Sequence, residues 1–213
     1  MTTNKNTPVK QTTMPVNSET IQTIFQRRAV RKYSDKEVDR TTIEKIIDAG
    51  RMAPSAMNTQ PWKFYVLTKK ADIEFYSKEI RHSITHALPH IGLKSIFKAG
   101  LEGLKHLSFG IEFLKEKDPV FHGAPVVIFI TAPKDYEWAG LDIGMCSQNM
   151  MLSAKALGLD TCPVGFGKFV MYSKSFNQLG IPEKEEILLA IIIGYGNEEP
   201  EIHPRKKDNV IYL

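Results

Sequence analysis

Residues 187–193 are an unbroken run of seven apolar side chains near the C-terminal end of the chain. Such a run predicts a strand that is covered on both faces, because a strand with one face in water alternates apolar and polar residues. A second apolar run at 126–131 predicts another buried strand, and residues 64–67 predict a shorter one. Helical patterns lie between these strands, so we expect a layered structure of sheet and helices.

The helical patterns differ in length and regularity. Short helices are expected at 18–27 and 173–179, and a longer one is expected at 142–157 with Gly158 as its left-handed cap. Residues 72–118 are a long helical stretch that proline and glycine interrupt. We interpret this least regular segment as a variable lid.

One further helix has two candidate starting points. It begins either at Asp39 or at Thr41, where Thr41-x-x-Glu44 has the spacing of a capping box. It should end before Pro54, because the residue that precedes a proline avoids the helical conformation.

The size of the chain limits its domain organisation. It has 213 residues, of which 42% are hydrophobic and 24% are charged. This length is that of one ordinary domain, which folds without a disulfide or a metal. We expect residues 1–18 to be a flexible tail and residues 19–213 to be a single domain. The two cysteines, Cys146 and Cys162, have no motif spacing and indicate a reducing compartment, so we expect a cytoplasmic location. No stretch approaches the ~20 apolar residues of a membrane span.

Positive charge is concentrated at the start of the chain, although the net charge is only +4. A local excess of charge indicates a local anionic ligand. Arg27, Arg28 and Arg31 can each bind an anion through two hydrogen bonds, but an isolated R-R-x-x-R is more often a solvated basic surface. We expect no nucleic-acid partner, because no nucleic-acid-binding motif accompanies these arginines. The charged residues of this region are Lys5, Lys10, Glu19, Arg27, Arg28, Arg31 and Lys32.

Three other segments carry polar groups or glycines, and each has a second interpretation. Residues 53–62 read A-P-S-A-M-N-T-Q-P-W, in which Ser55 and Asn58 can bind a polar ring edge or a polyol, or can satisfy only the turn itself. The glycines of 158–167 allow a backbone to approach a flat ligand, or they connect a helix to a strand. Gly194-Tyr195-Gly196 follows the last apolar run, and residues 204–207 form a second basic cluster or a solubilising tail.

Several familiar catalytic motifs are absent from the sequence, including the P-loop, the Rossmann fingerprint, the zinc-protease helix and the nucleophile elbow. His82, His86 and His90 have a helical spacing, but Pro89 disturbs it and no carboxylate is placed to join them. We therefore expect no metal site. Cys162 has no activating base nearby in the sequence, and we interpret it as a buried thiol.

In their order along the chain, these segments resemble the motifs of the FMN-dependent nitroreductase family. Residues 27–33, R-R-A-V-R-K-Y, are similar to the opening motif R-R-S-x-R-x-[FY], and residues 53–62 match A-P-S-x-x-N-x-Q-P-W almost letter for letter. The resemblance implies an α+β fold with a central, mixed and mostly antiparallel sheet flanked by helices. It also implies an intertwined homodimer with FMN at the interface. Weaker likenesses lie at 148–152, 158–159, 163–166, Gly194-Tyr195 and Arg205.

The resemblance assigns the arginines to FMN. Arg27 and Arg205 would hold the phosphate, and Arg28 and Ala29 would lie near the ribityl chain. Arg31 would lie beside N1 and O2 of the flavin. Ala29 departs from the serine that is usual in the family, so one hydrogen bond to the cofactor would be lost.

The resemblance also implies contacts from two loops. Pro54, Ser55 and Asn58 of the partner subunit would reach the flavin across the dimer interface. Beside the ring would lie Pro163, Val164 and Gly165, with the Gly165 N–H facing N5.

The implied reaction is reduction of nitroaromatics, quinones or related small electron-poor acceptors, with NADH or NADPH as donor. It would proceed by ping-pong hydride transfer through FMN. A fixed positive charge near N1 and O2 stabilises the reduced, anionic flavin. No catalytic side chain is implied, since the flavin carries the chemistry. A dehalogenase or flavin-fragmenting enzyme of the same fold, or a non-catalytic flavin-binding protein, is the alternative.

Overall fold

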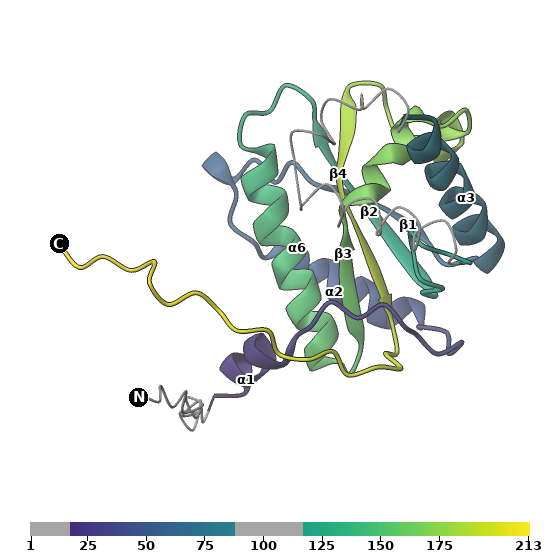
Figure 1. Cartoon of the computed structure of the whole chain (residues 1–213). Helices are drawn as coiled ribbons and strands as arrows, with labels where there is room; N and C mark the ends of the chain where they lie inside the picture. The colour runs from purple at the N-terminus through teal and green to yellow at the C-terminus, as the bar shows by residue number, and fades with distance from the viewer. Residues whose placement is uncertain (1–17, 88–116) are drawn as a thin grey trace, which may run out of the picture.

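The protein is described by a computed structural model that covers residues 18–87 and 117–213. Its sheet contains four antiparallel strands in the order β1-β2-β4-β3. The two long strands therefore lie in the middle of the sheet and the two short ones at its edges (Figure 1). The strands are β1 (Lys63–Leu67), β2 (Val126–Pro133), β3 (Asp160–Val164) and β4 (Glu185–Gly194).

Helices cover both faces of the sheet. One core contains residues of α2 and α6, and the other contains residues of α3 and η3, so the two pairs lie on opposite faces (Figure 1). This arrangement confirms the α+β fold with a mostly antiparallel sheet. The helices are α1 (Glu19–Gln26), α2 (Arg40–Arg51), α3 (Lys70–Ala87) and α6 (Ala139–Ala156), with the short 3₁₀ helices η1 (Ala56–Asn58), η3 (Gly165–Tyr172) and η4 (Phe176–Leu179).

The apolar run of β4 is buried on both faces, as its composition predicts. Ile191 and Ile193 belong to the core beneath α2 and α6, whereas Ala190 and Ile192 belong to the core beneath α3 and η3. Successive side chains of a strand point to opposite faces, so a strand between two helical layers needs apolar residues at every position. The predicted central strands are confirmed.

The ends of the helices show which local sequence signals determine where a helix begins and ends. The Asp39 side chain accepts a hydrogen bond from the Thr42 N–H at 2.9 Å, so Asp39 is the cap of α2 and the alternative start at Thr41 is wrong. The helix predicted at 142–157 begins earlier, at Ala139. Gly158 follows it with a φ of 78°, which confirms the left-handed cap.

Two helix predictions need correction, and one strand was not expected. The helix predicted at 173–179 is reduced to the four residues of η4. Of the stretch 72–118, α3 accounts for the part up to Ala87, and 88–116 lies outside the described residues. Strand β3 contains Pro163, which weakens its sequence signal, but an edge strand tolerates a residue that cannot donate a ladder hydrogen bond.

Two terminal segments lie on the outside of this body. No residue of α1 is buried, and residues 201–213 are all exposed. Figure 1 shows α1 near the C-terminal end of α6, with the C-terminal segment running past it and away from the sheet. No helix in the described ranges combines the length and apolar character needed to cross a membrane.

Candidate functional site

Residues 27–33 pair with β3 at Thr161 and then with the chain that follows β4 at Gly196. Ala29 forms a parallel bridge with Thr161, and the Val30 N–H donates to the Thr161 carbonyl at 3.1 Å. Val30 is only 1% exposed and anchors the segment. Arg27 and Arg31 flank this anchor, half-buried and exposed respectively, so the backbone pairing places both beside β3.

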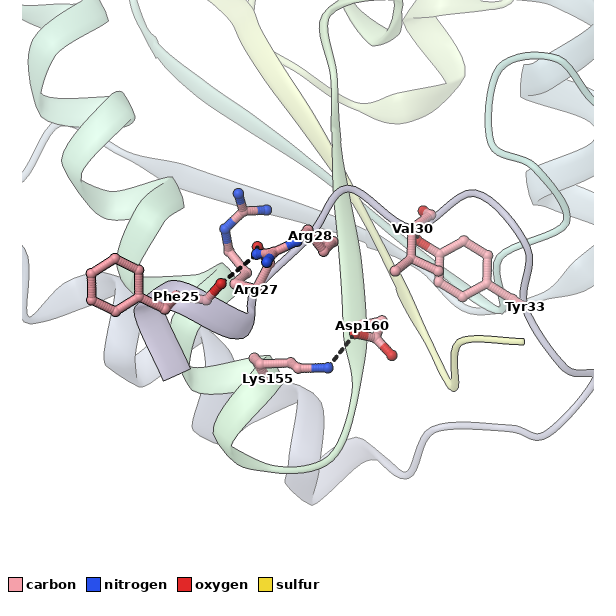
Figure 2. Close-up of polar contacts among 7 residues, drawn as sticks. All are labelled: Phe25, Arg27, Arg28, Val30, Tyr33, Lys155 and Asp160. Atoms are coloured by element: carbon pink, nitrogen blue, oxygen red, sulfur yellow. Dashed lines mark hydrogen bonds and ion pairs between the residues drawn. The ribbon is translucent and has the colours of Figure 1, made fainter. Parts of the chain in front are cut away.

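Arg28 closes the end of α1. Its Nη1 donates to the Phe25 carbonyl at 2.5 Å and to the Arg27 carbonyl at 2.8 Å, so it satisfies carbonyls that the helix end leaves without partners (Figure 2). Its buried Nε has no hydrogen-bond partner among the described residues. Arg28 therefore shapes the arginine segment and still has one donor to offer.

The start of the C-terminal segment pairs with the arginine segment. The Ser34 N–H donates to the Tyr195 carbonyl at 2.9 Å, and the Asn197 N–H donates to the Lys32 carbonyl at 2.8 Å. The Arg31 N–H donates to Glu198 Oε1 at 2.5 Å. The first and fourth sequence segments thus meet through backbone contacts, and Glu198 adds a carboxylate that sequence reasoning did not identify.

Arg205 lies farther along this segment, and within the described residues no hydrogen bond joins it to Arg27. It is exposed, and its Nη1 donates to the His203 carbonyl at 2.9 Å. The hydrogen bond described for the Arg205 side chain thus stays within its own segment.

Electrostatics distinguish the groups beside this edge. Burial raises the pKa of the Cys162 thiol, and the opposing positive charges of Arg31 and Arg27 do not cancel that effect. The thiol is thus neutral, which agrees with the buried thiol expected from the sequence. Burial also raises the pKa of Tyr33, whose hydroxyl donates to the Val30 carbonyl at 2.6 Å.

The end of β3 offers an open backbone surface. Pro163 and Gly165 are exposed, whereas Val164 is 7% exposed and belongs to the core. A Cβ built on Gly165 would meet no atom within 4 Å. A flat ligand can therefore approach this backbone closely.

The loop that follows α2 has a strained but well-connected backbone. Met57, Asn58 and Gln60 have φ angles of 51°, 54° and 47°, which are uncommon for residues other than glycine. The Ser55 hydroxyl accepts from the Gln60 N–H at 2.9 Å, and the Ser55 carbonyl accepts from the Asn58 N–H at 2.9 Å. Pro54 and Asn58 are exposed at its surface. Strain of this kind is retained where the surroundings determine the backbone.

A buried carboxylate that sequence reasoning missed anchors this loop. Asp142 is 1% exposed and accepts from the Ala56 N–H at 3.3 Å and from the Tyr136 hydroxyl at 2.7 Å. The Tyr136 hydroxyl also lies 2.7 Å from the Thr59 hydroxyl. Partial burial and the Asp142 carboxylate raise the pKa of Tyr136, so the phenol stays protonated. The sequence signal was an acidic residue in the first turn of α6.

The loop and the arginine segment lie at opposite ends of α6. Asp142 holds the loop at the first turn, whereas Lys155 in the last turn pairs with Asp160 at 2.9 Å, beside the residue that bridges Ala29 (Figure 2). The 18 residues of α6 span about 27 Å. Within one copy, then, the length of α6 separates Pro54, Ser55 and Asn58 from Arg27, Arg28, Ala29 and Arg31.

Of the three histidines spaced for a metal, His82 has a described side chain and His86 does not. The described residues contain no cluster of three or more His, Cys, Asp or Glu side chains suited to a metal ion. His90 lies outside the described residues.

Comparisons with known proteins give a consistent result. A family model described as "Nitroreductase family" matches residues 24–195. The 4-nitrobenzoate reductase of Pseudomonas putida is 32% identical over 200 residues, covering 84% of this chain and 86% of that protein. The nitrobenzene nitroreductase of Ectopseudomonas oleovorans is 30% identical over 200 residues, covering 84% and 87%.

Solved structures share the fold. A nitroreductase with bound FMN from Desulfitobacterium hafniense superposes with a TM-score of 0.74 at 23% identity, covering 93% of this chain and 100% of that one. A nitroreductase with bound FMN from Bacteroides fragilis has a TM-score of 0.73 at 22% identity, covering 92% and 99%.

Proposed function

The chain belongs to the nitroreductase family, and on that premise we propose that it is an FMN-dependent oxidoreductase. NADH or NADPH is the electron donor, and nitroaromatics, quinones or related electron-poor compounds are the acceptors. Relatives named for the reduction of 4-nitrobenzoate and nitrobenzene support the nitroaromatic class. We also propose that residues 19–213 act as a single FMN-binding domain and that the enzyme works in the cytoplasm.

The residues along β3 fit FMN in their chemistry. Guanidinium groups suit a phosphate, and Arg27 and Arg31 flank the pairing of Ala29 with Thr161. Two buried polar atoms, Arg28 Nε and Thr161 Oγ1, have no hydrogen-bond partner among the described residues. Buried polar groups are nearly always paired, so these two atoms support a polar ligand here. The Thr161 hydroxyl lies opposite Ala29 and can supply the hydrogen bond that Ala29 cannot.

We assign the following roles to the chain. Arg27 and Arg205 bind the phosphate, and Arg28 and Ala29 lie along the ribityl chain. Arg31 holds a positive charge beside the ring, where it favours the reduced form. When bound, FMN supplies the two-electron chemistry that links the nicotinamide to the acceptor. Pro163, Val164 and Gly165 supply the backbone surface for the ring.

A homodimer completes the site. The loop residues Pro54, Ser55 and Asn58 are separated from the arginines by the length of α6, so one copy alone contributes only part of the assigned set. Exposed apolar side chains near the two ends of the chain support an interface: Phe25 of α1 is 65% exposed and Tyr212 in the C-terminal segment is 94% exposed. In a dimer, the loop of one subunit meets the arginine segment of the other.

The observation that carries this function is the backbone pairing of Ala29 and Val30 with Thr161 of β3, the strand that ends at Val164 directly before the open surface at Gly165. The test is spectroscopic. We expect the purified protein to be yellow, or to acquire flavin absorbance when FMN is added, and excess NADH or NADPH to bleach that absorbance in the absence of oxygen.

Two outcomes would contradict the proposal at different points. A preparation that stays colourless in the presence of FMN contradicts cofactor binding. Bound FMN that neither nicotinamide bleaches contradicts the reductase and favours a flavin-binding protein without turnover. An acceptor panel containing a nitroaromatic, a quinone and a halogenated aromatic then separates reductase from dehalogenase activity.

A further inference from the structure

A large cavity lies between α3 and η3, apart from the residues assigned to FMN. Its volume is about 1150 Å³, and none of the assigned FMN residues lines it. Helix α3 packs directly against η3, so two helices form its walls. The cavity is lined by charged and aromatic side chains that include Lys78, Glu79, Arg81, His82, Phe169, Tyr172 and Lys174.

The sequence places these side chains on matching helix faces. Lys78, Arg81 and His82 have the spacing i, i+3, i+4, so they project from one side of α3. Phe169 and Tyr172 are three residues apart in η3, and side chains at that spacing lie above one another in a 3₁₀ helix. Their ring centroids are 6.0 Å apart. The cavity therefore has one wall that includes the cations Lys78 and Arg81 and one aromatic wall.

Among the described residues, no side chain neutralises the cations of this cavity. Within residues 18–87 and 117–213, no hydrogen bond or ion pair engages the side chains of Lys78, Arg81 or Lys174. The lining also includes Glu79, whose carboxylate accepts a hydrogen bond from the Ser175 hydroxyl at 2.7 Å. Among the described lining residues, three cations face one carboxylate that already has a partner, and this excess of positive charge favours an anion.

We propose that this cavity recognises an aromatic ligand with a carboxylate group, and that the ligand is the acceptor of the enzyme. Arg81 and Lys174 bind the carboxylate, and Phe169 and Tyr172 contact the ring. This inference rests on the proposed function, because Gly165, assigned to the flavin ring, is the first residue of η3. Phe169 follows four residues later, a rise of about 8 Å along a 3₁₀ helix. An acceptor beside Gly165 can thus extend its charged end into the cavity.

Binding without turnover tests the recognition step. Benzoate and its neutral analogue benzamide are titrated by calorimetry into the FMN-loaded wild type, an Arg81→Gln/Lys174→Gln variant and the control Lys168→Gln. Lys168 is an exposed cation of the same η3 that does not line the cavity. We expect the double variant to raise the Kd of benzoate by about three- to tenfold, as for a partly exposed charge pair, and to leave benzamide unchanged. Equal benzoate affinity in the wild type and the double variant, or no benzoate binding to the wild type, would overturn the proposal.

Turnover then identifies the source of the anion. We expect the double variant to raise KM for 4-nitrobenzoate, with KM for 4-nitrobenzamide and for NADH unchanged. A rise in KM for NADH alone would overturn the assignment to the acceptor, because the cavity would then bind the phosphates of the donor. If neither nitro compound is reduced while the benzoate preference persists, the proposed function fails and the recognition of an anionic aromatic stands.

Discussion

Residues 27–33 and residues 54–60 lie at opposite ends of α6 and are held by different interactions. The first segment is held by its backbone, since the Val30 N–H bonds to Thr161 and the Lys32 carbonyl accepts from Asn197. Apart from Arg28, its arginine side chains remain available to a ligand. The second segment is held by side chains, through the buried Asp142 and the bond of Ser55 to Gln60. Its geometry is set before a ligand arrives, which reduces the entropy lost on binding.

Removing the anchor of the loop should produce the largest effect. Asp142→Ala removes the acceptor of the Ala56 N–H and one of the two partners of the Tyr136 hydroxyl, and we expect a loss of about 3 kcal/mol in the free energy of unfolding. Urea denaturation measures this value, with Glu137→Ala, an exposed neighbour, as control. An Asp142→Ala protein as stable as the control would show that the loop does not depend on the carboxylate.

Removing a phosphate-binding side chain from residues 27–33 should weaken FMN binding and leave folding intact. For Arg27→Ala we expect FMN binding to weaken by roughly 1.5–3 kcal/mol, because the phosphate loses a charge-assisted hydrogen bond. Fluorescence titration of FMN measures the change. Arg40→Ala, which removes a side chain that is 91% exposed, is the control and should bind FMN normally. A large loss of stability in Arg27→Ala would contradict the separation between the two regions.

A smaller effect is expected at the other end of the same segment. Arg31→Ala removes the charge that favours the reduced flavin, so the reduction potential should fall by about 20 mV, equivalent to about 1 kcal/mol for two electrons. Equilibration with a reference dye measures the potential. If the potential is unchanged while the FMN affinity falls, Arg31 acts as a phosphate ligand instead.

The smallest effect is expected from the strained loop itself. Met57 is 90% exposed and has a positive φ, so Met57→Gly removes strain without removing packing. The greater flexibility of unfolded glycine offsets this gain, and we expect the free energy of unfolding to change by less than about 0.5 kcal/mol. Urea denaturation measures this change. A larger change in the free energy of unfolding would show that Met57 has a packing role or that the strain is greater than the dihedral angle indicates.

The sequence predicts the features that depend on neighbouring residues. The central strands follow from continuous apolar runs, and the cap of α6 follows from one glycine. The sequence does not predict β3. The five residues of this strand include Pro163, and its pairing is set by β4. Periodicity detects a strand only when several residues repeat, and β3 is too short for that.

The same limit applies to the candidate site. The motifs indicate which residues bind the ligand, but not what holds them. Asp142 lies 86 positions from Ala56, and Glu198 lies 167 positions from Arg31. Contacts of such separation arise from the topology of the sheet and the packing of α6, so no local pattern encodes them. The separation of residues 27–33 from residues 54–60 along α6 likewise depends on the three-dimensional structure, and no local pattern predicts it.

The length of α6 has a consequence for the proposed homodimer. If each cofactor is bound between the arginine segment of one subunit and the loop of the other, cofactor binding and subunit association share their free energy. Dilution that separates the subunits should then release FMN, and added FMN should draw the subunits together. The apparent affinity for FMN would therefore depend on the protein concentration as well as on the residues of the site.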